Sequence, residues 1–413
     1  MTTTKTLILL ALLAPAVALA NGYDVPNVSP RDLALAGSTV AAQRDAGATY
    51  GNPAALASLP AGLNLSLAVS LLDLESTWTS PDGSQSTSML FKPQPPPALY
   101  AAWAGKAGDR GWGVGLGLTV PAGGNVFWPD AWAGRFRILE VDRKVYGLYL
   151  SGGFDLVPGL LRVGGGPVYY RTTETLKQKV NFFTSEGGAE LGTAGGALAY
   201  DLSAELTLPG APVVIGVDYK ERGKQTLKGK AHFTGVPADL ATTLVDQGVT
   251  HELIYPRVLH TGVAFHPSRK VTFTAAFTYN WYEDYQNDTF RGDFATSCPS
   301  PTCVVVPRNY GNGFTFRYGA EFNATDDLQL RLGVLRDYSG YKSSTVSPTL
   351  PDGNTWAYSA GAGYQFSPSL AANLGLFYAP FDTVTATGSE AFAGSYQTHA
   401  FVGALGITWT PSR

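Results

Sequence analysis

The chain has 413 residues, 15% of them charged, and a net charge of −3 at pH 7. A net charge this close to zero gives no reason to expect nucleic acid or a strongly acidic partner. Glycine and aromatic residues are abundant, whereas the charged fraction lies about ten points below that of a typical soluble domain. This composition indicates a sheet in contact with apolar groups on two sides rather than a chain folded around a single hydrophobic core.

Residues 1–20 are predicted to be a secretory signal peptide. They contain one early lysine, an apolar stretch from Leu7 to Leu19, and small residues at Ala18 and Ala20, directly before Asn21. This is the pattern of a cleaved export signal. The alternative, a membrane-anchoring helix, needs a longer apolar stretch with less polar flanks. We therefore expect the mature protein to begin near Asn21 and to lie beyond the inner membrane.

A short alanine-rich segment, residues 29–59, is predicted to form two helical turns. Ser29 can cap a turn that starts at Pro30, where the missing N–H costs nothing. Asn52 can accept hydrogen bonds from the free amides of a second turn, which starts at Pro53. A segment this small cannot be a domain. It is either a solvated leader or a piece that packs inside or against the structure built by the strands.

Almost everything after Gly62 is predicted to be β-strand. Apolar and polar residues alternate at period two in segments about ten residues long, which is the length a tilted strand needs to cross a bilayer. The clearest segment is 271–280, where apolar and aromatic residues alternate with threonine, alanine and asparagine. One face of each strand is suited to hydrocarbon and the other to water or a plug.

The connections between these strands alternate in length. Six short turns, such as 105–110, alternate with seven long loops, such as 121–142, 172–194 and 221–256, which leaves fourteen strands. A soluble β-sandwich or propeller would also show period-two alternation, but short turns on one side and long loops on the other are typical of an outer-membrane barrel. We predict an all-β, transmembrane antiparallel barrel at residues 62–413, with residues 21–61 as an N-terminal helical plug in its lumen.

Two segments near the N-terminus resemble the hatch, or plug, of the FadL family of outer-membrane transporters for long-chain fatty acids and other hydrophobic compounds. They are residues 33–37 and residues 45–56, and the second contains Asn-Pro-Ala, the best-known signature of that family. The likeness extends by pattern over essentially the whole mature chain. It implies a fourteen-stranded barrel closed by an N-terminal hatch, in agreement with the loop pattern. The hatch residues singled out are Leu35, Gly37, Tyr50, Asn52, Pro53 and Ala54.

The resemblance also implies a passive route, with no cofactor. A hydrophobic molecule is captured among the outer loops, enters an apolar pocket, and leaves sideways through a gap at a kinked strand. The third strand is the candidate for this gap, because Gly113, Gly115 and Gly117 make its wall thin. The alternative is that these glycines only make room for the hatch.

Arg171 matches the position of a fatty-acid-binding arginine of that family and would pair with a carboxylate headgroup. Its alternative role is that of a charge at the barrel rim. The second basic residue of the family's site has no clear match, since glycine stands in the aligned region near Gly311 and Arg308 is only a neighbour. A neutral hydrophobic ligand is therefore an alternative to a fatty acid.

Two further sets of residues are predicted to stabilise the structure. Cys298 and Cys303, an even pair in an exported loop, are expected to form a disulfide, because no neighbouring Cys or His would complete a metal site. Arg317, Glu321 and Arg331 are predicted to face inward and to form ion pairs between wall and hatch.

Catalytic and nucleotide-binding motifs are absent from the sequence, so we expect no enzymatic activity. The function predicted is passive uptake of hydrophobic molecules, such as long-chain fatty acids, by a monomer in contact with outer-membrane lipid. A polar-solute porin is the alternative within the same fold, and a surface adhesin or structural protein is the alternative from another class.

Overall fold

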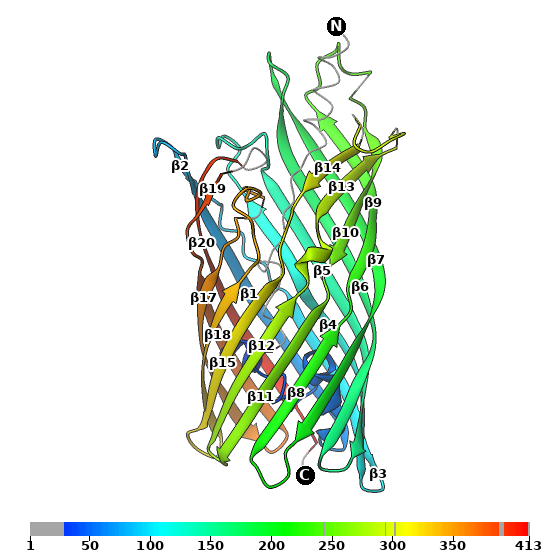
Figure 1. Cartoon of the computed structure of the whole chain (residues 1–413), viewed down its shortest axis with the longest axis vertical. Helices are drawn as coiled ribbons and strands as arrows, with labels where there is room; N and C mark the ends of the chain where they lie inside the picture. The colour runs from blue at the N-terminus through cyan, green and yellow to red at the C-terminus, as the bar shows by residue number, and fades with distance from the viewer. Residues whose placement is uncertain are drawn as a thin grey trace.

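The computed structural model describes residues 29–242, 244–293, 295–300, 303–349, 351–387 and 392–411. The predicted signal peptide and the first residues of the predicted hatch, 21–28, lie outside them. The strands form one closed antiparallel sheet, because the first strand, β1, pairs with the last, β20, from Leu65 opposite Trp409 to Thr79 opposite Ser395 (Figure 1). Among the described residues, no helix is both long and apolar enough to cross a bilayer.

The sheet makes fourteen crossings, which confirms the predicted barrel. Its strands are β1 (Gly62–Thr79), β2 (Ser86–Ser88), β3 (Pro97–Ala107), β4 (Arg110–Phe127), β5 (Glu140–Val157), β6 (Leu161–Asn181), β7 (Glu186–Thr207), β8 (Val213–Lys220), β9 (Gly223–Thr234) and β10 (Gln247–Tyr255), followed by β11 (Val258–Ser268), β12 (Val271–Asn280), β13 (Asn287–Gly292), β14 (Cys303–Pro307), β15 (Gly313–Asn323), β16 (Leu328–Tyr338), β17 (Thr355–Ser367), β18 (Leu370–Pro380), β19 (Val384–Ala386) and β20 (Gly394–Trp409). Four crossings are each split in two by an interruption, namely β8 with β9, β10 with β11, β12 with β13, and β14 with β15.

The barrel wall is longer than the sequence predicted. β6 and β7 have 21 and 22 residues, about twice the length that a tilted strand needs to cross a bilayer. Most of the predicted loops 172–194 and 221–256 are therefore strand. They were not recognised because their outward side chains are polar, and the contrast between two faces is weak there.

The described residues also form four short helices, which are α2 (Pro30–Ala34), α3 (Ala48–Gly51), η2 (Pro53–Ser58) and η3 (Tyr282–Asp284). The first three form the described part of the predicted hatch, residues 29–59. Figure 1 shows them inside the barrel, near the end that carries the short turns. α2 contacts β16, β17, β18 and β20, whereas η2 contacts β3, β4, β5, β6 and β7, so the hatch touches the wall on two sides.

Local caps explain why the hatch has these turns. The Ser29 side chain accepts a hydrogen bond from the backbone N–H of Asp32, and Pro30 occupies the first helical turn. The Asn52 side chain likewise accepts from the backbone N–H of Ala54. Both predicted caps are confirmed.

Candidate functional site: the lumen, the hatch and a break in the wall

Asn52 joins the hatch to itself and to the wall. Its side chain is fully buried, and its amide donates to the carbonyl oxygen of Val40, 2.7 Å away, and to that of Ala204 on β7, 3.4 Å away. The backbone N–H of Ala54 also lies 2.9 Å from the hydroxyl of Ser203 on β7. The predicted hatch residues Asn52, Pro53 and Ala54 therefore form a turn that is hydrogen-bonded to the sheet.

The predicted ion pairs between wall and hatch are present around Glu321 on β15. Its carboxylate is paired with Arg31 and Arg44 of the hatch, at 2.9 and 2.8 Å, and with Arg331 on β16, at 2.7 Å. Arg317 takes a different part, because it donates to the carbonyl oxygen of Ala36 at 3.1 Å. Withdrawal of the hatch would remove two of the three guanidinium partners of this buried carboxylate, so the cluster opposes withdrawal.

Lys220 on β8 provides a second attachment, which the sequence analysis did not identify. Its ammonium group is buried and lies 2.7 Å from Asp201, 2.6 Å from Asp218 and 2.6 Å from the carbonyl oxygen of Tyr50. The alternation in β8 does place Asp218 and Lys220 on one face of the strand, and this was the available signal. Leu35, Gly37 and Tyr50, the other predicted hatch residues, lie within the same packed segment, with Leu35 fully buried.

The three glycines proposed for a lateral opening face the hatch. A Cβ atom at Gly113 would lie 2.5 Å from the carbonyl oxygen of Leu56, and one at Gly115 would collide with the hydroxyl of Thr49. Between Trp112 and Thr119, β4 is paired continuously with both β3 and β5. The wall is therefore closed at Gly113, Gly115 and Gly117, and these residues make room for the hatch.

The same strand is interrupted a few residues further on. Its register against β5 shifts between Thr119 and Ala122, so that Val120 and Pro121 form a β-bulge opposite Tyr146. On the other side, the ladder with β3 ends at Ala98 opposite Thr119, and the residues that would continue it are Pro95, Pro96 and Pro97. Proline has no N–H to donate to a ladder. Both edges of β4 thus lose regular pairing at the same height.

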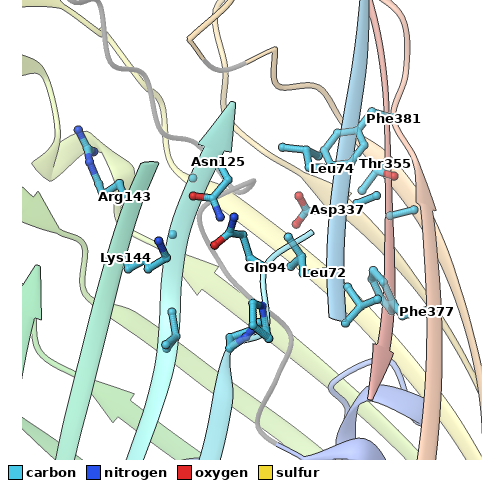
Figure 2. A pocket seen from close by; sticks show the side chains of 18 of the residues that line it. Leu72, Leu74, Gln94, Asn125, Arg143, Lys144, Asp337, Thr355, Phe377 and Phe381 are labelled. Atoms are coloured by element: carbon cyan, nitrogen blue, oxygen red, sulfur yellow. The ribbon is translucent and has the colours of Figure 1, made fainter. Parts of the chain in front are cut away.

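A cavity of about 310 Å³ reaches this break from the lumen. Figure 2 shows the polar side chains Gln94, Asn125 and Lys144 on one side of it and the apolar side chains Leu74, Phe377 and Phe381 on the other. Much of the apolar lining comes from the inward faces of β1, β18 and β20, which contribute Leu72, Leu74, Phe377, Ala379, Ala400 and Val402.

The polar end of the cavity extends past the wall. On β5 the side chains of Arg143 and Val145 are completely buried, and alternation directs Lys144 and Tyr146 to the opposite, outer face. Lys144 and Tyr146 nevertheless line the same cavity as Leu72 on the inner face of β1. Residues from both faces of β5 therefore line one cavity beside the interruption of β4.

The two arginines proposed for a ligand carboxylate are not brought together. Arg171 is exposed on β6, between the buried side chains of Tyr170 and Thr172, so it points away from the lumen. Arg308 is buried and paired with Asp288, with 2.6 Å between nitrogen and oxygen. Neither residue lines the cavity. Their positions therefore do not support a contact of Arg171, or of its suggested companion Arg308, with a ligand carboxylate in this cavity.

A buried chain of charges crosses the upper barrel and includes Arg308. Arg143, which lines the cavity, is 2.8 Å from Glu174, and Asp288 is paired with Arg308. His251 links the two carboxylates, because its Nδ1 lies 3.1 Å from Glu174 and its Nε2 lies 2.9 Å from Asp288. Two carboxylates facing both ring nitrogens require both nitrogens to carry a proton. No sequence motif marks this chain, since its members come from four strands and a loop.

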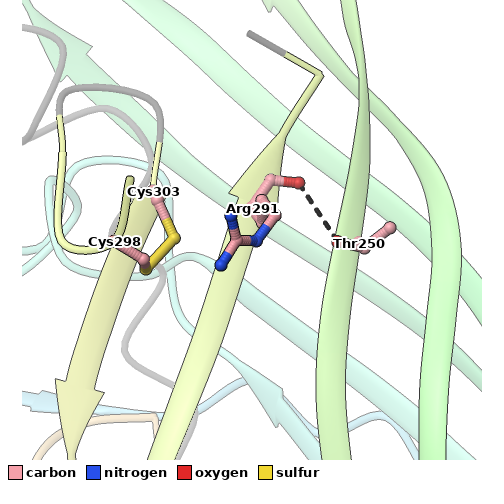
Figure 3. Close-up of a disulfide and its surroundings, with 4 residues drawn as sticks. All are labelled: Thr250, Arg291, Cys298 and Cys303. Carbon is pink, nitrogen blue, oxygen red and sulfur yellow. Dashed lines mark hydrogen bonds between the residues drawn. A yellow bond between two sulfur atoms is a disulfide. The ribbon is translucent and has the colours of Figure 1, made fainter. Parts of the chain in front are cut away.

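The disulfide between Cys298 and Cys303 is formed, as predicted (Figure 3). It closes a small ring next to β13, where the carbonyl oxygen of Arg291 accepts a hydrogen bond from Thr250 on β10. In the described part of the chain, no group of three or more His, Cys, Asp or Glu side chains is arranged to hold a metal ion.

A closed transmembrane barrel with an inner plug and an apolar lumen cavity defines the protein as an outer-membrane channel. A family profile described as "Outer membrane protein transport protein (OMPP1/FadL/TodX)" matches residues 11–410. The chain belongs to this family, whose members are transport channels and not enzymes.

Solved structures with the same fold include a FadL homologue from Pseudomonas aeruginosa, with a TM-score of 0.82, 17% identity, and coverage of 94% of this chain and 99% of that one. The toluene transporter TodX of Pseudomonas putida gives a TM-score of 0.76 at 15% identity, over 94% and 100% of the two chains. Outer membrane protein P1 of Haemophilus influenzae is 26% identical over 168 residues, which are 40% of this chain and 32% of that protein.

Proposed function

We propose that the protein takes up hydrophobic molecules passively and releases them sideways into the outer membrane at the break in β4. The observation that carries this proposal is the cavity that joins the apolar side chains of the lumen to outward-facing residues of β5 beside Val120 and Pro121. The free energy of a hydrophobic molecule falls when it moves from water to an apolar surface. This route keeps the molecule next to apolar atoms as far as the bilayer.

The hatch supports sideways exit rather than passage along the barrel axis. It is held by buried ion pairs to β15 and by Lys220 on β8, and its turns pack against the wall on two sides. The relatives support the class of molecule, because one of the similar structures is a FadL homologue and another is a toluene transporter. The cavity has apolar side chains together with amide and ammonium groups, which suits hydrophobic molecules with or without a polar end.

Deletion of Pro121 tests the exit. Without this residue, Val120 would follow Thr119 in register opposite Tyr146, and Ala122 would remain opposite Val145, so the extra residue of the bulge would be gone. Pro121→Ala, which keeps the residue count and hence the bulge, is the matched control. We expect the deletion to reduce uptake of a radiolabelled fatty acid and of toluene toward the rate of cells that lack the gene, and the alanine variant to retain uptake.

The folded state of both variants is checked by the mobility of unheated protein on denaturing gels. Unchanged uptake by a folded deletion variant would place the exit elsewhere. A polar-solute porin would be indicated instead if the purified protein conducted ions steadily while uptake of neither hydrophobic compound depended on the gene.

A further inference from the structure

We propose that the outer face of β5, β6, β7 and β9, directly above the apolar belt, binds the phosphorylated headgroup of an outer-leaflet lipid. Arg171, Lys144, Lys228 and Lys230 lie on this face. Lys144 also lines the lumen cavity, but Arg171, Lys228 and Lys230 do not, so the inference can be tested apart from the transport route.

Strand register shows where the apolar belt ends. Leu148, Tyr169 and Leu198 are paired across β5, β6 and β7, and their exposed fractions are 45%, 41% and 77%. Exposed apolar side chains in such a row are suited to acyl chains. Two residues further along each strand, about 7 Å away, the row consists of Tyr146, Arg171 and Gly196. Arg171 is thus adjacent to the last apolar row.

The next row is basic at both ends. Lys144 is paired with Thr173, Thr173 with Ala194, and Ala194 with Lys228, so that one line of residues crosses four strands. The two lysine backbones are three strand spacings apart, about 14 Å. Only small residues stand between them, and a groove of about 340 Å³ lies over this row.

The groove is open at its centre. Gly192, which lines it, has no atom within 4 Å of where a Cβ would lie, and Thr175 next to it presents a hydroxyl group. Lys230 is the residue paired with Gly192 on β9 and adds a further cation. Hydroxyl and ammonium donors around an open floor are the groups that bind a phosphate.

The charges on this face favour an anion. Asp142 is paired with Lys144 at 2.6 Å and partly neutralises it. For Arg171, Lys228 and Lys230, no carboxylate of the described residues lies within ion-pair distance. Basic residues close to an anionic membrane surface strengthen binding to it.

A lipid fits this surface better than a free anion does. The basic rows follow directly on Leu148, Tyr169 and Leu198, so that a single molecule can place acyl chains on the belt and its phosphate in the groove. A free phosphate would contact only the groove and not the apolar belt. Arg171 points away from the lumen and so cannot contact a ligand there. Binding of a lipid headgroup gives this residue a role on the outer face.

The test compares lipid binding by two charge-reversal variants of the full-length mature protein, purified in detergent and stripped of lipid. Arg171→Glu with Lys228→Glu changes the proposed surface. The control is Lys106→Glu with Lys270→Glu, which makes the same charge change at two exposed lysines at the short turns. The probes are diphosphorylated lipid A, its dephosphorylated form and inorganic phosphate, and binding is followed by native mass spectrometry.

We expect the first variant to bind diphosphorylated lipid A about tenfold or more weakly than the wild type, and the control to bind it unchanged. The dephosphorylated lipid should bind weakly to all three proteins, and added salt should weaken only the phosphate-dependent part. Equal binding by the two variants would overturn the proposal. Displacement of the lipid by millimolar inorganic phosphate would also overturn it, since the surface would then be a site for a free anion.

Discussion

Gly115 shows how closely the hatch and wall are fitted. Its inward face touches the side chain of Thr49, which is completely buried, so a methyl group has no space unless the hatch moves. Overpacking of this kind typically costs about 1–3 kcal/mol. Gly152 on β5 is a suitable comparison, because a Cβ there would meet only one backbone atom, the carbonyl oxygen of Gly113, 3.8 Å away.

We therefore predict that Gly115→Ala loosens the hatch and that Gly152→Ala does not. Single-channel conductance in planar bilayers is the measurement, because a displaced hatch opens a path for ions along the barrel axis. Gly115→Ala should show frequent conducting events, whereas Gly152→Ala should resemble the wild type. If both alanine variants were equally silent, the hatch would tolerate the extra methyl group and the packing argument would be wrong.

Residues that act through local backbone rules were predictable, and those that depend on a partner far away in sequence were not. Asn52 and Ser29 were identified because a cap requires only the two or three residues that follow it. Arg171 illustrates the opposite case. Its direction depends on which face of β6 is turned toward the lumen, and a one-residue change in that assignment reverses every side chain.

At the scale of elements, the loop between β16 and β17 carries a buried acid. Asp352 is 2% exposed, and burial raises its pKa to about 8. The folded protein therefore holds a proton on Asp352 at pH values where the unfolded chain has lost it. Because the native state binds more protons between about pH 4 and pH 8, the stability contributed by this residue decreases as the pH rises through that range.

This sign leads to a prediction for the loop. Above pH 8 the ionised Asp352 should weaken the packing of the loop between β16 and β17. This packing includes the hydrogen bond from the Trp128 indole to the carbonyl oxygen of Pro348. Tryptophan fluorescence of the wild type should change with a midpoint near pH 8. Asp352→Asn, which resembles the protonated acid, should lack this change. The same transition in both proteins would assign it to another group.

The number of strands could be predicted from the sequence, but their length could not. Turn residues and the alternation of 271–280 depend on neighbouring positions, and they led to fourteen crossings. The upper halves of β6 and β7 are polar outside and contain charged residues such as Glu174 inside, so the pattern there resembles a loop. The interruption of β4 lies three residues beyond Gly117, the last of the glycines singled out in the sequence, because the proline run at 95–97 removes hydrogen-bond donors from the neighbouring strand.

At the scale of the whole molecule, the barrel has two candidate exits, and only one requires the hatch to move. The attachments of the hatch lie on different strands: Glu321 on β15 is paired with Arg31, and Lys220 on β8 is bonded to Tyr50. Both are buried, and withdrawal of the hatch would separate Arg31 from Glu321 and remove the Tyr50 carbonyl oxygen from the Lys220 ammonium group. The opening beside β4 involves neither of them. A transport cycle that leaves the hatch in place therefore avoids a large free-energy cost.

A disulfide that fixes the hatch to the wall separates these two routes. Ser38 in the hatch and Thr274 on β12 have their hydroxyl oxygens 2.6 Å apart, close enough for two cysteine sulfur atoms to bond after small adjustments. We predict that Ser38→Cys with Thr274→Cys takes up fatty acid at the same rate when oxidised and when reduced. Ser38→Cys alone and the wild type serve as controls, because the reductant also acts on the disulfide between Cys298 and Cys303. If oxidation stopped uptake by the double variant alone, and reduction restored it, the hatch would have to move during transport and exit beside β4 would be insufficient.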